Sequence, residues 1–272
     1  MIKGRAKAML TNATFLKGLA IQAIDGELGT VDRFLFDDET WGIRYLTVKT
    51  GGWLSGREVL ISPISIVHAD WPARRLDVTL TRKQVENSPD IDTHKPVSRQ
   101  HETDYFGYYG YSGYWGGPYM WGPAYYPAAL AVPNNEAGEA MLRRAGKLLS
   151  DSHLRSSAAV TGYYVEATDG EIGHVNGFVI DDETWAVRYI EVATRNWLPG
   201  KKVLVSPEWI EGVSWEESKV RIALSRDAVK EAPEYVSTKP MTREYESKLY
   251  FYYGRPPYWL PQAEHAESVS LV

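Results

Sequence analysis

Apolar and polar residues alternate along much of this chain, and the alternation predicts β-strands more often than helices. The clearest run is residues 75–80, in which Leu76, Val78 and Leu80 alternate with charged or hydroxyl side chains. A period of two places one row of side chains on a buried face and the other in solvent. The pattern predicts six strands in the first part of the chain, at about residues 18–24, 28–36, 43–49, 59–61, 64–69 and 75–80.

The same pattern occurs a second time, displaced by 144 residues without a gap. Between residues 25–63 and 169–207, 22 of the 39 positions are identical. The repeat predicts two copies of one small, mainly β domain, since a self-similar period defines a structural unit. Asp25-Gly26 and Asp169-Gly170 predict a tight hairpin turn in each copy, because glycine takes a positive φ without steric cost.

A run of acidic residues follows the second predicted strand of each copy. It reads Asp37-Asp38-Glu39 in the first and Asp181-Asp182-Glu183 in the second. A calcium loop needs alternate oxygen ligands, a glycine and a distal glutamate, and this spacing lacks them. We interpret each run as a solvated hairpin turn, with a weak cation site or a partner contact as the alternative.

An arginine opens the third predicted strand of each copy and is in phase with the aliphatic residues that face the core. A charge on that side costs several kcal/mol unless it is paired. We therefore predict an arginine–carboxylate clamp with a structural role; the alternative is an arginine that emerges at the rim of the domain. The candidate partners are Asp37 or Asp38 for Arg44, Asp181 or Asp182 for Arg188, and, on the C-terminal arms, Glu102 or Glu246.

Each copy continues into a C-terminal arm. Thr81 and Gln84 form the pattern of a capping box, which predicts a short helix that ends before Pro89. Beyond it the arms match again and end in aromatic residues, for which we weigh a lid over the core against a binding surface. The interaction candidates are Trp53 and Trp197 in a matched loop, and Tyr108, Tyr109, Tyr252 and Tyr253 on the arms.

The segment between the copies is uncharged from residue 105 to residue 135 and rich in tyrosine, glycine and proline. We interpret it as a linker, either a tether that lies on the domains or an aromatic surface for binding or self-association. A short amphipathic helix is predicted after it. The expected organisation is a first unit at 1–104, a linker at 105–135, a helix at 136–150, a second unit at 151–260 and a tail at 261–272.

Composition narrows the functional classes. The chain has no cysteine, which excludes disulfides and thiol chemistry and fits a reducing compartment such as the cytoplasm. Its net charge is −5, and no basic stripe is visible, so nucleic acid is not an expected partner. The first residues lack the apolar core of a signal peptide, and no run is long and apolar enough for a transmembrane helix.

Candidate catalytic and cofactor residues are scarce. None of the six histidines recurs at its partner position 144 residues away, and no HxxxH or HExxH spacing occurs. A metal or acid–base centre shared by both copies is therefore not expected. Asp37 and Asp38 could form an acid–base pair, but residues of an exposed turn seldom hold the shifted pKa values that such a pair needs. We predict no enzyme, no cofactor and no metal site.

The combined motif resembles the PRC-barrel family. It consists of Asp-Gly-Glu-x-Gly-x-Val, Phe-x-x-Asp-Asp-Glu-Thr-Trp, Arg-Tyr and Val-Leu-x-Ser-Pro, and the resemblance covers residues 18–80 and 162–224. This family includes the cytoplasmic domain of the photosynthetic reaction centre H subunit and the C-terminal domain of the ribosome maturation factor RimM. The resemblance implies two small, closed, antiparallel barrels in tandem, each with a short C-terminal helix and an aromatic arm. The arms look like those of stand-alone bacterial proteins with two such barrels.

The resemblance implies binding to proteins and not catalysis. We therefore expect a scaffold or adaptor whose two barrels pack as an intramolecular pseudo-dimer and bind a protein partner. The alternative is a peripheral membrane or photosynthetic-complex accessory protein. The H subunit has a membrane helix and RimM a different N-terminal domain, and the sequence has neither in the matching place, which weakens a reaction-centre or a ribosome role.

Overall fold

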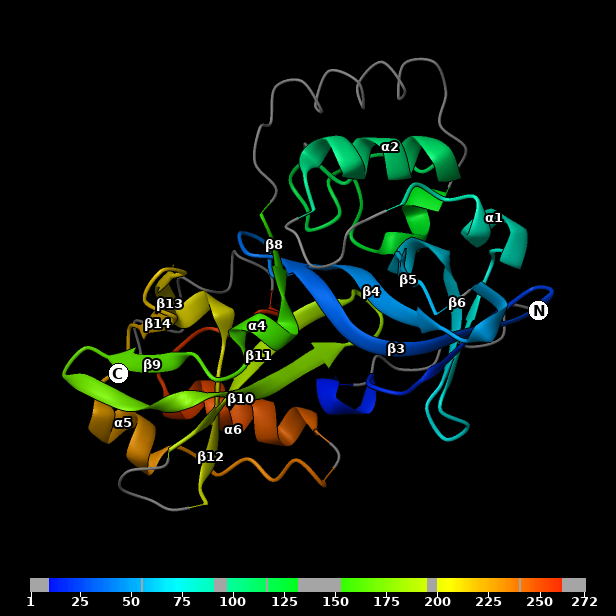
Figure 1. Ribbon diagram of the computed structural model, residues 1–272. Helices are drawn as coiled ribbons and strands as arrows, with labels where there is room; N and C mark the ends of the chain where they lie inside the picture. The colour runs from blue at the N-terminus through cyan, green and yellow to red at the C-terminus, as the bar shows by residue number, and fades with distance from the viewer. Residues whose placement is uncertain are drawn as a thin grey trace.

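The computed structural model describes residues 10–54, 56–90, 97–115, 117–131, 153–194, 200–239 and 241–260. Within them the chain forms two seven-stranded sheets that lie side by side, each with its own helices (Figure 1). We call the parts built mainly from residues 13–131 and 157–260 the first and the second half. The fold is therefore mainly β, as the alternating pattern predicts.

The first sheet has the strand order β5-β4-β3-β2-β7-β6, and β8 pairs with the remaining edge of β3. Its strands are β2 (Ala20–Ala23), β3 (Gly26–Asp37), β4 (Ile43–Thr50), β5 (Glu58–Ile61), β6 (Ile66–Asp70), β7 (Arg75–Val78) and β8 (Leu154–Ser156).

The second sheet repeats this arrangement with the order β12-β11-β10-β9-β14-β13, and β1 pairs with β10. Its strands are β1 (Leu10–Asn12), β9 (Tyr164–Ala167), β10 (Gly170–Asp181), β11 (Ala186–Ala193), β12 (Lys202–Val205), β13 (Ile210–Ser214) and β14 (Lys219–Ile222).

Neither sheet is the closed antiparallel barrel that the resemblance implies. Each has two end strands, β5 and β6 in the first and β12 and β13 in the second, and each contains one parallel pair, β2 with β7 or β9 with β14. At β5 a side chain takes the place of a further strand. The hydroxyl of Tyr105 donates to the carbonyl of Leu60 and accepts from the amide of Ser62, both at 3.1 Å. An edge capped in this way needs no neighbouring strand to satisfy its backbone.

The two halves exchange their first strands. β1 precedes the first half but pairs with β10, and β8 precedes the second half but pairs with β3. The registers are equivalent, because Thr11 faces Ile180 and Arg155 faces Phe36, and each pair of equivalent residues is 144 apart. Each sheet is thus completed by a strand from the other half.

Short helices follow the strands of each half. The capping box of Thr81 and Gln84 is present and begins α1. The longer helices α2 and α6 form the arms (Figure 1). The helices are α1 (Arg82–Glu86), α2 (Arg99–Tyr109), α4 (Ser157–Val160), α5 (Arg226–Glu231) and α6 (Arg243–Tyr252), and the 3-10 turns are η1 (Ala13–Phe15), η2 (Gly52–Leu54), η3 (Pro63–Ser65), η4 (Pro127–Ala131) and η5 (Pro207–Trp209).

Helix α2 runs through the boundary expected between residues 104 and 105. The aromatic segment beyond that boundary packs against the first half, with buried and exposed residues along its described part. Its buried hydrophobic side chains include Tyr105, Phe106, Tyr111, Tyr114, Trp115, Trp121 and Leu130. The helix expected at 136–150 and the tail at 261–272 lie outside the described residues.

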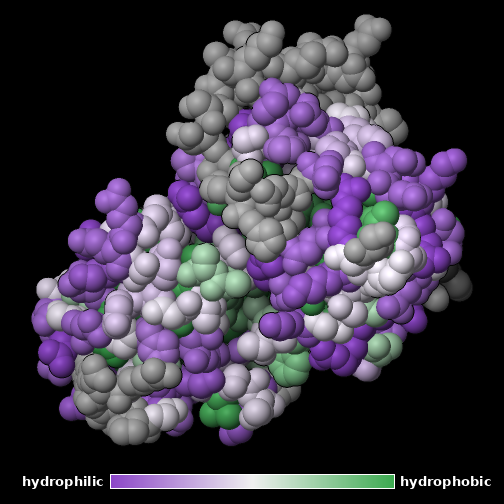
Figure 2. Space-filling model, in the orientation of Figure 1, coloured by the Kyte–Doolittle hydropathy of each residue, from purple (hydrophilic) through white to green (hydrophobic). Residues whose placement is uncertain are grey.

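The surface is mostly polar in the view of Figure 2, where hydrophobic residues show along the furrow between the two bodies. Among the described residues, no helix combines the length and the apolar character that crossing a membrane requires.

The glycine that ends the Asp-Gly-Glu-x-Gly motif is required by a close backbone approach. Gly29 and Gly173 have φ of +147° and +148°, and a Cβ on either would lie 2.1 or 2.0 Å from the carbonyl oxygen of Lys49 or Ala193. Both the positive φ and the contact exclude a side chain. The motif therefore fixes the crossing of the long strand with its neighbour.

We expect Gly29→Ala to lower the free energy of unfolding by on the order of 3–5 kcal/mol, because backbone atoms cannot move away from the new methyl group. Gly177→Ala is the matched control: it lies in the long strand β10, where a Cβ meets no atom within 4 Å. Its effect should stay within about 1 kcal/mol. Urea unfolding of both variants measures the difference, and equal stabilities would contradict the assignment.

Candidate functional site

The two acidic turns meet at the junction of the halves. Gly42 and Ala186, which are equivalent residues, form an antiparallel bridge. On either side, the amide of Ile43 donates to the carbonyl of Trp185 at 2.7 Å, and the amide of Val187 donates to the carbonyl of Trp41 at 2.8 Å. The contacts are reciprocal, so an approximate two-fold axis passes through this bridge.

Each turn is organised by its first aspartate. Oδ1 of Asp37 accepts from the amides of Glu39 and Thr40 at 3.1 and 2.8 Å, and Asp181 makes the equivalent bonds. Both aspartates are buried. The expectation of a solvated turn is therefore wrong for this residue, because packing against the other half removes it from water, whereas Glu39 stays exposed.

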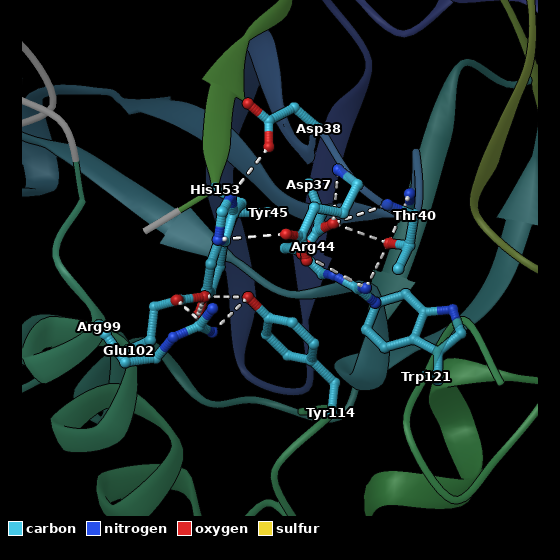
Figure 3. A network of polar contacts seen from close by, with 12 residues as sticks. Asp37, Asp38, Thr40, Arg44, Tyr45, Arg99, Glu102, Tyr114, Trp121 and His153 are labelled. Atoms are coloured by element: carbon cyan, nitrogen blue, oxygen red, sulfur yellow. Dashed lines mark hydrogen bonds and ion pairs between the residues drawn. The ribbon is translucent and has the colours of Figure 1, made fainter. Parts of the chain in front are cut away.

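The structure brings each arginine to the first aspartate of its own turn. Arg188 donates from Nη2 to Asp181 Oδ2 at 2.9 Å, and the equivalent atoms of Arg44 and Asp37 are 3.8 Å apart. Arg44 is 1% exposed and also donates to the Thr40 hydroxyl at 2.8 Å (Figure 3). Neither arginine emerges fully at a rim.

An aromatic ring covers each guanidinium group. The Cζ atom of Arg44 lies 3.8 Å from the ring centroid of Tyr114, and that of Arg188 lies 4.2 Å from Tyr258. Such stacking stabilises a buried cation through the ring quadrupole. Burial by itself would raise the pKa of Asp181, but the charge of Arg188 and the hydrogen bonds from Arg188, Glu183 and Thr184 together outweigh it and hold that pKa below its usual range.

The second aspartate of each turn, Asp38 or Asp182, bonds to a residue other than the arginine proposed as its partner. Asp38 Oδ2 accepts from Arg155 Nε at 2.7 Å, and Asp182 Oδ2 accepts from the indole of Trp71 at 2.8 Å. The first bond holds the exchanged strand β8 on the first half, and the second joins the first half to the second. Sequence spacing alone does not show this, since Asp38 and Arg155 are 117 residues apart.

Glu102 is the centre of a buried polar network in the first half (Figure 3). Its carboxylate lies 2.7 Å from Arg99 Nη1 and accepts from the hydroxyls of Tyr114 and Tyr45 at 2.6 and 3.3 Å. Glu102 comes from the arm helix α2, and Tyr45 from β4 at the core of the sheet. The network therefore fixes the arm on the sheet.

The second half repeats this network with equivalent residues. Glu246 lies 2.8 Å from Arg243, and it accepts from the hydroxyls of Tyr189 and Tyr258 at 2.7 and 3.0 Å. Glu102 and Glu246 thus pair with the arginine of their own helix, and not directly with Arg44 or Arg188 as the alternative proposed.

Sequence reasoning missed the tyrosine that joins the clamp to the network. Tyr114 contacts both Arg44 and Glu102, and Tyr258 does the same for Arg188 and Glu246. The signal was present, because Tyr114-Trp115 and Tyr258-Trp259 are also 144 residues apart. It lay inside a segment interpreted as a linker.

Burial controls the ionisation of the network. It raises the pKa of the Glu102 carboxyl from 4.5 to about 7, although the neighbouring Arg99 favours the charged form. Burial also raises the pKa of Glu246 and, together with the charge of Glu102, the pKa of Tyr45. A carboxyl group that titrates near neutrality couples the attachment of the arm to pH.

The aromatic interaction candidates divide into covered and exposed rings. Trp53 is half-buried and donates to the carbonyl of Leu28 at 2.7 Å, so it covers the core. Tyr109 and Tyr253 are also half-buried against the halves. Tyr108 and Tyr252 are 41% and 37% exposed, and each bonds to a carbonyl of the preceding short helix. Trp197 lies outside the described residues.

In the described parts of the chain, no group of three or more histidine, aspartate or glutamate side chains is close enough to hold a metal ion. A pocket of about 450 Å³ opens beside the acidic turn of the first half and is lined largely by the second half.

We expect Arg44→Leu and Arg188→Leu each to cost about 1–3 kcal/mol of stability, because each leaves a buried aspartate without its cation and removes a stacked guanidinium. Arg221→Leu is the control. Its side chain is 49% exposed and pairs with Glu217 four residues earlier, so its loss should cost under about 1 kcal/mol. Chemical denaturation compares the three, and a clamp variant as stable as the control would rule out the structural role.

We expect the Glu102→Gln variant to lose a pH dependence that the unchanged chain shows. The folded state holds the Glu102 proton up to about pH 7, while the unfolded chain releases it near 4.5, so stability falls as the pH rises between these values. The difference in unfolding free energy between the two proteins should change by up to about 3 kcal/mol from pH 4.5 to 7.5. A constant difference would show that Glu102 titrates normally.

Part of the first half matches a known protein family. Residues 12–81 match the sequence model of the PRC-barrel domain. The matched segment begins at the end of β1 and stops at the N-cap of α1, so it contains strands β2 to β7. A comparison with curated proteins gave no match. Residues 12–81 are therefore similar to a PRC-barrel domain, and their own strands form an open sheet.

Proposed function

We propose that this protein is a non-enzymatic adaptor in which two PRC-barrel units form an intramolecular pseudo-dimer and bind a protein partner. The second unit is residues 151–260. The support for it is the repeated sequence, the identical strand order and the repeated buried network of this half. The absence of cysteine fits action in a reducing compartment such as the cytoplasm.

Reciprocal contacts support the pseudo-dimer. The exchanged strands, the bridge of Gly42 with Ala186 and the edge-to-face contact of Phe34 with Phe178 at 5.5 Å all relate equivalent residues. A self-complementary surface of this kind is typical of a two-fold homodimer. A duplicated and fused chain retains that surface between its two copies.

The adaptor proposal depends mainly on one observation: the ionisable groups that match between the two halves are engaged in contacts within the fold. Each half contains one arginine–aspartate pair and one arginine–glutamate pair. The two members of each pair contact each other, and each pair also contacts a tyrosine of the same half. Groups engaged in this way hold the fold together. What the repeat retains is structural, so we assign function to the surface, where the two halves differ.

The arm helices illustrate this difference. The equivalent positions on their outer faces hold Gly107 in α2 and Phe251 in α6, and Phe251 is 89% exposed. Tyr108 and Tyr252 flank them with nearly equal exposure. Two similar bodies that present different side chains can distinguish the faces of one partner, which a symmetric homodimer cannot do.

The test is to isolate the tagged full-length chain from its native cell and to reconstitute any complex from purified components. We expect one protein to remain at a fixed ratio and to bind again in the purified system. The tag alone is the control. Recovery of the chain by itself, or its co-sedimentation with anionic vesicles when no other protein is present, would contradict the adaptor function, and the second result would favour a peripheral membrane role.

A further inference from the structure

In the first half, the chain inserts one of its own tryptophans beside the clamp. The side chain of Trp121 is wholly buried, and its indole N–H donates to the carbonyl of Thr184 at 2.7 Å. The Cζ atom of Arg44 lies 4.7 Å from its ring, and the ring of Tyr114 lies 6.3 Å away (Figure 3). The site is therefore built from an arginine, a tyrosine and a turn carbonyl of the other half.

A short segment holds this tryptophan in place. Tyr119 and Gly122 bond to each other through both backbone groups at 3.1 and 2.9 Å, which forms a tight turn around Trp121. Beyond the turn, η4 packs against η3 of the first half. Residues 117–131 thus fill the space beside the clamp of the first half. Trp121 lies near one end of this segment, and the turn that begins at Pro127 lies at the other.

The equivalent position of the second half is open. The pocket of about 450 Å³ is lined by Thr40, Arg188, Tyr258 and Pro207. At the offset of 144, Thr40 is equivalent to Thr184, Arg188 to Arg44, and Tyr258 to Tyr114, and Thr184, Arg44 and Tyr114 hold Trp121 in the first half. Pro207 is equivalent to Pro63 of η3. The second half therefore has the same wall without the inserted segment.

The residues given after Trp259 differ in composition from those that carry the insert of the first half. Residues 260–272, which follow Trp259 as residues 116–131 follow Trp115, contain no tryptophan, tyrosine or phenylalanine. The volume lies in the range of about 300–1,000 Å³ that is typical of ligand sites. It is large enough for an indole and part of the chain that carries it.

Acidic side chains at the rim of the pocket limit the charge that an occupant can carry. Glu39 and Glu211 line it and are exposed. Its one arginine, Arg188, is paired with Asp181. An occupant with carboxylates beside its aromatic residue would be repelled, whereas a neutral or basic segment is tolerated or attracted.

We propose that this pocket binds a tryptophan side chain from a neutral or basic segment of a partner polypeptide. The indole N–H donates to the Thr40 carbonyl, and the ring lies beside Arg188 and Tyr258, as Trp121 lies beside Arg44 and Tyr114. The inference deepens the proposed adaptor function and rests on it, because it names the recognition site for the partner.

The experiment uses the full-length protein and a fluorescein-labelled peptide with the sequence of residues 117–131 as the probe. That segment already fits the equivalent site, which its covalent copy occupies in the first half. Fluorescence anisotropy should show saturable binding of one peptide per chain. A peptide with Trp121→Ala should bind at least about tenfold more weakly, as expected for loss of a central aromatic anchor. A peptide with benzothienylalanine, which lacks the N–H, should also bind more weakly.

Gly212→Leu is the blocking variant. Gly212 lines the pocket, a Cβ there meets no atom within 4 Å, and the equivalent residue of the first half is His68, so the fold accepts a side chain at this position. We expect at least a tenfold loss of peptide affinity with an unchanged melting temperature. The matched control is Gly107→Leu, which adds the same side chain to an exposed glycine of α2 with open surroundings and should leave affinity unchanged.

Two results would overturn the proposal: no peptide binding, or equal binding by Gly212→Leu. Retention of a native partner equally by the unchanged chain and by Gly212→Leu would also overturn it, while the adaptor function would stand. Peptide binding without any retained partner would support the pocket and remove the adaptor function. Self-association of the full-length chain that Gly212→Leu abolishes would identify a second copy as the occupant and would overturn the assignment to a different polypeptide.

Discussion

The cost of burying charge shapes each half of this protein. A glutamate and an arginine placed inside a small β domain must be paired and hydrogen-bonded, or the domain would not be stable. The sheet supplies one tyrosine, the arm helix supplies the Glu102–Arg99 pair, and the segment after the helix supplies Tyr114. The arm is therefore part of the domain, because its buried Glu102–Arg99 pair is hydrogen-bonded by tyrosines of the sheet and of the segment after the helix.

The same tyrosine connects the network to the junction between the halves. Tyr114 stacks on Arg44, Arg44 pairs with Asp37, and Asp37 organises the turn that meets its equivalent in the other half. A continuous chain of contacts thus runs from the arm to the pseudo-two-fold axis. Trp41, which has a positive φ of 59°, ends the turn at that axis, where its carbonyl accepts from the opposite half. A bulky residue keeps such a backbone conformation only where its surroundings compensate for the strain.

The sequence predicts the local features of this fold well and its long-range pairings poorly. The repeat, the alternating strands, the hairpin turn at Gly26 and the capping box at Thr81 all follow from short-range patterns, and the pairing of Arg188 with Asp181 follows from a hairpin of known length. The exchanged strands β1 and β8 have three residues each, too few for a periodicity to be recognised. The role of Trp121 was hidden for another reason, since an uncharged segment rich in glycine and proline has the composition of a linker.

The exchange of strands also determines how the chain can be completed during synthesis. β1 is made before the first half, yet its partner residues on β10 end at Asp181, 171 residues after Leu10. The edge of β3 at Leu35–Asp37 likewise has no partner until residues 154–156 are made. Each sheet therefore carries an unpaired edge until most of the chain exists, and such edges can pair with another nascent chain. Because both halves belong to one chain, each exchanged strand is on the same molecule as its partner edge, which favours the correct pairing over pairing with another chain.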